Sequence, residues 1–220
     1  MIWQKLCSRE SWARFCSTLR YALYTMVHPF DGFWDLTHER RGSLAAANFI
    51  VFMALASRLL SLQHTSFLFM SVYWPEVNIL QQCLSILLPL AIFCVCNWGL
   101  TTLFEGKGRL RDVYIGTAYA LTPNVILSLA VIPLSNVITM EEGAFYTVLT
   151  GAGLLWSGAL IVCAMMMIHD YTLKKALLFI FMTVGAMLIV IFLMLLFFSL
   201  VSDGVGYFVS LYKEIVFRLN

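Results

Sequence analysis

Charged residues are scarce in this chain. Asp, Glu, Lys and Arg make up 12% of its 220 residues, whereas hydrophobic residues make up 61% and the mean hydropathy is +0.86. A soluble domain is about a quarter charged and about half apolar. The low charge therefore excludes an ordinary soluble domain and indicates an integral membrane protein. The net charge of +2 is also too small to indicate a nucleic-acid partner.

The chain also lacks the short motifs of common enzymes and metal sites. It contains no H-E-x-x-H, no G-x-S-x-G and no glycine-rich phosphate loop followed by Lys and Ser or Thr. None of its six cysteines forms a C-x-x-C pair. His28, His38 and His169 fall on one predicted side of the membrane, but their spacing matches no known metal motif. We therefore expect no catalytic residue, no metal site and no cofactor.

Five long apolar stretches predict five transmembrane helices. Each is long enough for the ~20 residues that a helix needs to cross the hydrocarbon layer, and a helix satisfies its own backbone polar groups in lipid. The predicted fold class is therefore all-α, a bundle of five transmembrane helices. The predicted spans are 43–62, 79–104, 113–138, 144–168 and 175–201, which leaves an N-terminal segment, 1–42, and a C-terminal segment, 202–220.

The basic residues fall in alternate gaps between these stretches. The N-terminal segment and the gaps after the second and fourth spans contain eleven of the 14 Lys and Arg residues, whereas the gaps after the first and third spans contain none. Basic loops stay on the cytoplasmic side of a membrane. This predicts a cytoplasmic N-terminus and a C-terminus on the outer side of the membrane. The eleven residues are Lys5, Arg9, Arg14, Arg20, Arg40, Arg41, Lys107, Arg109, Arg111, Lys174 and Lys175.

Amphipathic stretches flank the five spans at both ends. The N-terminal segment shows no cleavable signal peptide; its apolar residues recur at helical spacing and predict a surface helix that ends before Pro29. This helix is expected to face anionic lipid, to pack on the protein's own loops, or to do both. Apolar residues of the C-terminal segment follow a similar spacing, and Asp203–Gly204 is expected to separate this second helix from the fifth span. It is expected to lie on the outer membrane face or to dock on a partner.

Polar residues interrupt the apolar runs of the second and third spans. A proline beside an asparagine, Pro123–Asn124, predicts a kink whose freed backbone is satisfied by a neighbouring side chain. The predicted polar network consists of Asn97, Thr101, Thr122 and Asn124. It serves either helix packing, at roughly 0.6 kcal/mol per bond, or a solute path. No predicted span contains Asp or Glu, which argues against a proton relay or a cation pump.

Two groups of short stretches resemble the Yip1-domain family. HPFDGFW at 28–34 and ERRGS at 39–43 are similar to the segment that leads into the first span of prokaryotic members. NW at 97–98, TTL at 101–103, GKG at 106–108 and YALTP at 119–123 are similar to the family's central signature. The resemblance covers about residues 28–200 and implies a five-span bacterial plasma-membrane protein. The eukaryotic branch has a long cytoplasmic N-terminal region with no counterpart here, so a role in vesicle trafficking is not expected.

The resemblance implies a membrane role without a settled activity. Some bacterial members accompany ABC-type sugar transporters, so the favoured hypothesis is a non-enzymatic scaffold or accessory subunit of a membrane complex. Its expected partners are the lipid bilayer and other integral membrane proteins, ABC transporter permease subunits among them. The alternative is a small-solute channel or transporter that uses the polar and proline-kinked part of spans two and three; an intramembrane enzyme is the least favoured. The candidate interaction surface comprises Phe30, Phe33, Trp34, Arg40, Arg41, Lys107, Arg109, Arg111, Phe208 and Tyr212.

Overall fold

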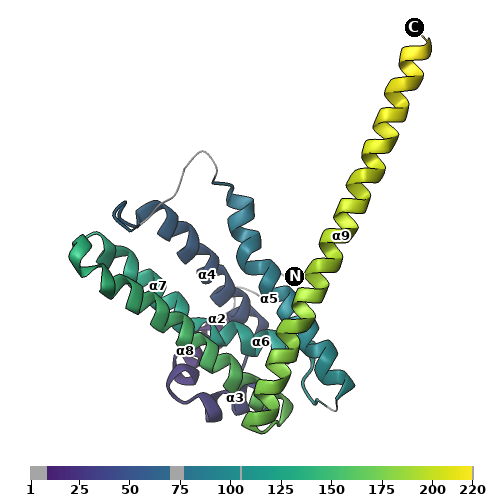
Figure 1. The fold of residues 1–220 in the computed structure, drawn as a ribbon. Coiled ribbons are helices and arrows are strands. Elements are labelled where there is room, and N and C mark those ends of the chain that lie inside the picture. The colour runs from purple at the N-terminus through teal and green to yellow at the C-terminus, as the bar shows by residue number, and fades with distance from the viewer. Residues whose placement is uncertain (1–8, 70–76, 105, 220) are drawn as a thin grey trace.

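The computed structural model describes residues 9–69, 77–104 and 106–219, without the side chains of residues 9–14, 215, 216 and 219. The described residues form helices joined by short turns and contain no strand. Lys5 and the side chains of Arg9 and Arg14 thus lie outside the described part. Figure 1 shows the elements, which are α2 (Arg9–Val27), α3 (Pro29–His38), α4 (Leu44–His64), α5 (Ile79–Leu103), α6 (Leu110–Ala120), α7 (Thr122–Ser135), η2 (Met140–Glu142), α8 (Gly143–His169) and α9 (Leu173–Leu219).

Five helical stretches of the described chain are long and apolar enough to cross a membrane, which confirms the predicted fold class. They are α4, α5, α6 together with α7, η2 together with α8, and α9. Polar side chains cap the starts of the first two. The Ser43 hydroxyl accepts the backbone N–H of Ala46 at 3.1 Å, and the Asn78 side chain accepts that of Leu80 at 2.9 Å. The predicted starts at residues 43 and 79 therefore agree with the structure to within one residue.

The third span is kinked between α6 and α7, as the sequence predicted. Pro123 has no backbone N–H, so it cannot bond to the carbonyl of Tyr119 four residues earlier. The Thr122 hydroxyl donates a hydrogen bond to that carbonyl instead, at 2.7 Å. The kink therefore leaves no broken bond at Tyr119, whose side chain is fully buried in the main core.

The three segments that contain most basic residues meet at one end of the bundle, called the basic end below. Lys107 of the α5–α6 turn forms an ion pair with Asp170 of the α8–α9 turn, with Nζ 2.9 Å from Oδ2. At the opposite end, the Asn136 side chain donates to the carbonyl of His64 at 2.8 Å. The gaps that the charge pattern assigned to opposite sides of the membrane thus lie at opposite ends of the bundle.

The N-terminal helices α2 and α3 form a hairpin that packs on α4, α6, α7 and α8. α2 ends at Val27, before Pro29, as predicted. Gly32 makes the hairpin tight, because a Cβ at this position would lie 2.8 Å from the Cα of Thr25. Of the two expectations for this helix, packing on the protein is met. Phe33 was predicted to belong to the interaction surface, but it is fully buried in the main core.

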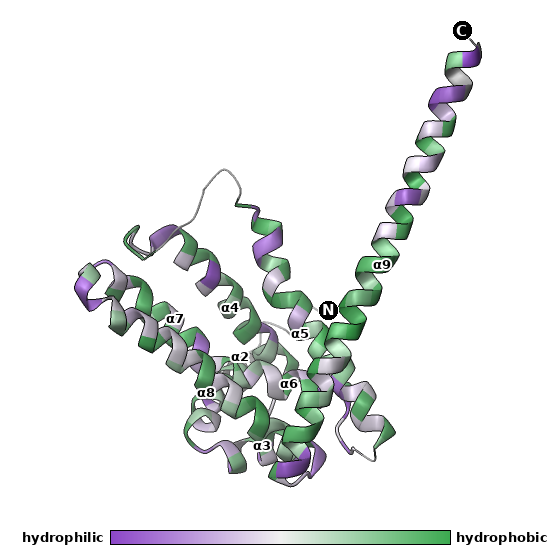
Figure 2. Cartoon of the chain, viewed as in Figure 1, coloured by the Kyte–Doolittle hydropathy of each residue, from purple (hydrophilic) through white to green (hydrophobic). Residues whose placement is uncertain are grey.

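Helix α9 differs from the prediction. It is continuous over 47 residues and runs through Asp203–Gly204 without a break, so the C-terminal segment is not a separate helix. Such a helix is ~70 Å long at 1.5 Å per residue, more than twice the ~30 Å of the hydrocarbon layer. Its first turns pack on α5 and α8, and every described side chain from Phe192 onward is exposed. Figure 2 shows this projecting part as apolar near the bundle and more polar towards the C-terminus.

Candidate functional site at the basic end

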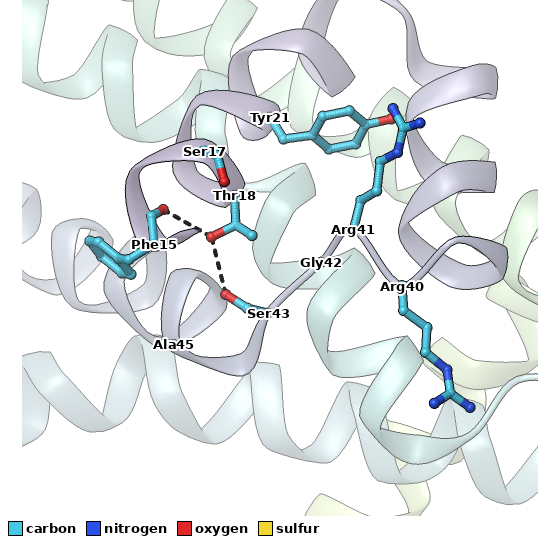
Figure 3. A pocket seen from close by; sticks show the side chains of 9 residues that line it. All are labelled: Phe15, Ser17, Thr18, Tyr21, Arg40, Arg41, Gly42, Ser43 and Ala45. Carbon is cyan, nitrogen blue, oxygen red and sulfur yellow. Dashed lines mark hydrogen bonds between the residues drawn. The ribbon is translucent and has the colours of Figure 1, made fainter. Parts of the chain in front are cut away.

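A hollow of about 620 Å³ lies between α2 and the turn that joins α3 to α4 (Figure 3). Thr18 makes two hydrogen bonds at this hollow. Its hydroxyl donates to the Phe15 carbonyl at 2.9 Å and accepts from the Ser43 hydroxyl at 3.3 Å. The buried Tyr119 donates to the Thr18 carbonyl at 3.1 Å. These bonds connect α2 to the N-terminal cap of α4 and to α6.

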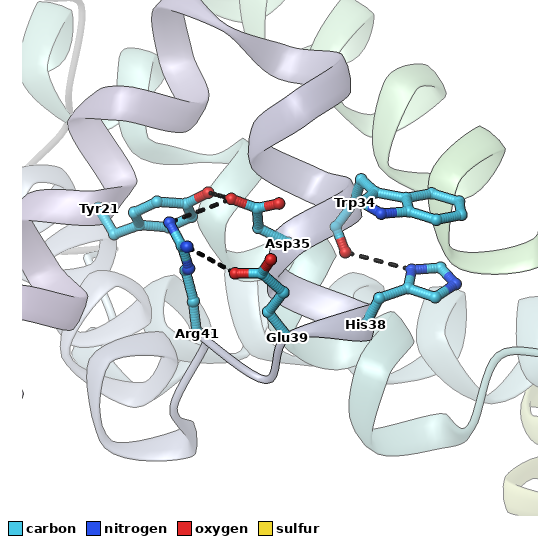
Figure 4. A network of polar contacts seen from close by, with 6 residues as sticks. All are labelled: Tyr21, Trp34, Asp35, His38, Glu39 and Arg41. Atoms are coloured by element: carbon cyan, nitrogen blue, oxygen red, sulfur yellow. Dashed lines mark hydrogen bonds and ion pairs between the residues drawn. The ribbon is translucent and has the colours of Figure 1, made fainter.

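A polar clasp holds the far side of this hollow (Figure 4). The Tyr21 hydroxyl donates to Asp35 Oδ2 at 2.8 Å, and Arg41 Nη1 lies 3.2 Å from the same oxygen. The second nitrogen of Arg41, Nη2, pairs with Glu39. Burial raises the pKa of Tyr21, and the hydrogen bond to the Asp35 carboxylate raises it further. Arg41 is therefore engaged within the protein, whereas the sequence assigned it to a surface for partners.

A second hollow, of about 330 Å³, lies between the end of α3 and the start of α6. Arg40, Arg109 and Arg111 line it, so three of the predicted surface arginines converge although they come from two distant segments. Lys107 does not join them, because it pairs with Asp170. The remaining predicted surface residues are spread out: Phe30 and Trp34 are exposed on α3, and Phe208 and Tyr212 are exposed on the far part of α9.

A buried chain of hydrogen bonds lies beneath the basic end. The backbone N–H of Gly108 donates to His169 Nδ1 at 3.3 Å, so Nδ1 is an acceptor and the proton of the neutral ring is on Nε2. Nε2 then donates to Asn97 Oδ1 at 3.2 Å, and Asn97 Nδ2 donates to Thr183 Oγ1 at 3.2 Å. The Thr183 hydroxyl donates to the carbonyl of Phe179 at 2.7 Å, which completes the chain. It connects the α5–α6 turn, α8, α5 and α9 with every donor matched to an acceptor.

The four residues of the predicted polar network lie in two places. Thr101 stays beside Asn97, because its hydroxyl donates to the Asn97 carbonyl at 2.7 Å. Thr122 and Asn124 lie at the α6–α7 kink, where the Asn124 N–H donates to the Ser157 hydroxyl of α8 at 3.2 Å. The hydrogen bonds of the described residues do not join the two groups.

Sequence reasoning considered His169 only as one of three histidines for a metal site, and it missed both Thr183 and the contact of the neighbouring glycines with the histidine ring. A Cβ on Gly108 would lie 2.6 Å from His169 Cε1, and one on Gly106 would lie 3.0 Å from His169 Nδ1. The Gly-Lys-Gly stretch therefore packs closely against the His169 ring and also forms the turn. In the sequence, the two glycines that flank Lys107 indicate that something packs closely against this turn. A single sequence does not say which side chain that is. Among the described residues, no three His, Cys, Asp or Glu side chains gather as a metal site.

Comparison with a family model identifies the domain that this chain forms. The model of the Yip1 domain matches residues 23–200. The chain belongs to the Yip1 family. Searches of curated proteins and of solved structures gave no match.

The Yip1 match includes the whole second hollow and the whole buried chain around His169. The first hollow is matched only in part, because Phe15, Ser17, Thr18 and Tyr21 of its lining lie before residue 23. The match ends at residue 200, so the last part of α9 lies beyond the Yip1 domain. Most of the packed end of the bundle therefore lies within the Yip1 domain, and the far part of α9 lies outside it.

Proposed function

We propose that this Yip1-family protein is a non-enzymatic scaffold or accessory subunit of a bacterial plasma-membrane complex, with its basic end in the cytoplasm. The observation that carries the proposal is helix α9, most of which has no contact with the bundle. Lipid covers an apolar helix only over the ~30 Å of the hydrocarbon layer. The apolar residues beyond it, such as Phe208 and Tyr212, are 70% exposed each. Apolar surface outside the lipid marks a site for another protein.

A permease subunit of an ABC-type sugar transporter is the partner that we propose. Such a subunit offers both an apolar membrane face and a part outside the membrane, which matches the two sections of α9. The apolar side chains of the far section follow one stripe, with Val205, Phe208 and Tyr212 on the same side of the helix. Tyr207 points away from that stripe, because successive residues are turned by about 100°.

We expect Phe208→Ser to abolish association with the partner. The change puts a hydroxyl in the centre of the stripe and removes an aromatic anchor of the kind that dominates interfaces. Affinity purification of the full chain in mild detergent, followed by mass spectrometry, measures whether a permease is recovered in stoichiometric amounts. Tyr207→Ser is the matched control, since Tyr207 is similarly exposed at 66%, and it should leave recovery unchanged. Recovery of only a homo-oligomer, or equal loss with both variants, would contradict the proposal.

The alternative function, a small-solute transporter, is favoured by one observation. A cavity of about 390 Å³ lies among α4, α5, α7 and α8, and Arg58, Ser128, Thr150 and Asn124 are among its polar lining residues. Arg58 is held in position by a hydrogen bond from Nε to Gln82 Oε1 at 3.1 Å. Asn97 is not among the lining residues, so the two asparagines named from the sequence do not share one path.

If the cavity serves transport, Asn124→Ala should reduce solute flux into reconstituted vesicles about tenfold. The reason is that a site built on polar groups discriminates strongly when one of them is lost. Thr102→Ala is the control, because this exposed hydroxyl bonds only to the carbonyl of Trp98 in its own helix. Absence of any flux from a broad panel of solutes with the unmodified protein would remove the transporter hypothesis.

A further inference from the structure

The hollow between α3 and α6 has an excess of positive charge. Arg40, Arg109 and Arg111 line it, and Asp112 is its one acidic lining residue. The Asp112 carboxylate already accepts the backbone N–H of Arg109 at 3.4 Å, as part of a capping box at the start of α6. Within the described part of the chain, the ion pairs are formed by Arg41, Lys107 and Arg218, so none of the three lining arginines has a carboxylate partner. Three arginines thus line a hollow that contains a single carboxylate, and none of the three is ion-paired to a described residue.

The backbone of Arg40 is strained, and the turn that contains it places this residue at the hollow. Its backbone φ is +52°, in the left-handed region, where an L-residue costs about 1–2 kcal/mol. This position directly follows a helix end, where glycine is the usual residue. Gly42 holds the turn against α6, because a Cβ there would lie 2.8 Å from Leu36 Cδ2 and 2.9 Å from Ile115 Cγ2. An arginine therefore stands where glycine would be more stable, and the tight turn places it beside Arg109 and Arg111.

The hollow lies at the level where the helices enter the membrane. Arg40 is four residues before Leu44, the start of α4, and Arg109 directly precedes Leu110, the start of α6. Both helices are candidate membrane spans, so the three guanidinium groups lie at headgroup depth. The planar guanidinium fork matches the oxygens of a phosphate group.

We propose that Arg40, Arg109 and Arg111 bind the phosphate of an anionic phospholipid headgroup. The lipid is a better match than free phosphate, because the headgroup layer brings a phosphate to this depth while its acyl chains enter the bilayer beside α4 and α6. The proposal does not depend on which side of the membrane the basic end faces. It also does not depend on a protein partner, so its failure and the failure of the scaffold proposal are distinguishable.

The test measures binding of phosphatidylglycerol and of phosphatidylcholine with the same acyl chains to the purified full-length protein, by native mass spectrometry. We expect phosphatidylglycerol to bind preferentially, and Arg109→Gln or Arg111→Gln to weaken that binding about tenfold each, as for the loss of a hydrogen bond to a charged group. Arg40→Gly should weaken it similarly while the fold is kept, because glycine accepts the left-handed backbone without strain. Arg41→Gln is the matched control and should have little effect, since Arg41 is already paired with Asp35 and Glu39.

The outcomes separate the sources of the phosphate. Equal binding of the two lipids, or equal effects of Arg41→Gln and Arg109→Gln, would overturn the proposal. Competition by inorganic phosphate at concentrations as low as those of the lipid would overturn its lipid part and leave a site for free phosphate. Normal thermal stability of Arg40→Gly together with lost phosphatidylglycerol preference would support it, because that result excludes unfolding as the cause.

Discussion

Replacing Gly108 by alanine is expected to lower the stability of the protein by roughly 2–3 kcal/mol, or about 5–10 °C in melting temperature. The new Cβ would lie 2.5 Å from Ile168 Cγ2 and 2.6 Å from His169 Cε1. Neither neighbour has room to move, because Ile168 is 3% exposed in the main core and the ring of His169 is fixed by Asn97. The turn must shift instead, which also breaks the hydrogen bond from the Gly108 N–H to His169 Nδ1.

The same substitution at Gly99 provides the matched control. A Cβ at Gly99, in the last two turns of α5, would meet no atom within 4 Å. Alanine is favoured over glycine inside a helix by about 1 kcal/mol. Gly99→Ala should therefore melt at the same temperature as the unmodified protein or higher, in thermal unfolding followed in detergent by loss of monodisperse protein. Similar melting temperatures for the two variants would show that His169 is not tightly seated.

The number and positions of the spans were predictable because the bilayer imposes a length that is visible in one sequence. Residues 79–104 were predicted as the second span, and α5 covers Ile79–Leu103. The kink at Pro123 was predictable for a similarly local reason, the missing N–H. The end of α9 was not, because Asp203–Gly204 is a turn signal only when other contacts favour a turn. In α9 no packing interrupts the helix, and its backbone bonds continue through both residues.

The candidate site was predictable only in part, because contacts between residues of different helices leave no periodic pattern in the sequence. Asn97 was singled out because an amide inside an apolar run is conspicuous, but its partners are 72 and 86 residues away in the chain. The convergence of Arg40 with Arg109 depends on how the α3–α4 turn packs on α6, which the charge pattern does not report. Phe33 was misplaced for the opposite reason: a residue in an amphipathic hairpin faces lipid or protein, and only the packing decides which.

Asn97→Leu is expected to destabilise the protein by about 3 kcal/mol, which exceeds the roughly 0.6 kcal/mol average for a hydrogen bond between membrane helices. The larger value follows from burial: Asn97 is 1% exposed, His169 2% and Thr183 0%. Leucine has the same branched arrangement of four side-chain heavy atoms but leaves His169 Nε2–H without an acceptor, and a buried orphaned donor loses its full hydration energy. Thermal or denaturant unfolding of the full chain measures the change, with Thr102→Ala as a neutral neighbour on the same helix.

A double-mutant cycle with His169→Phe distinguishes packing from solute transport. If Asn97 serves the buried chain, removing both polar partners should cost less than the sum of the single changes by at least about 1 kcal/mol, because no donor between them is then orphaned. Additive effects would show that the Asn97–His169 bond does not carry the stability. Because Asn97 is absent from the lining of the cavity that holds Asn124, its loss should change melting temperature without changing the selectivity of any solute flux. A selective change in flux at unaltered stability would instead place Asn97 on the path of the solute.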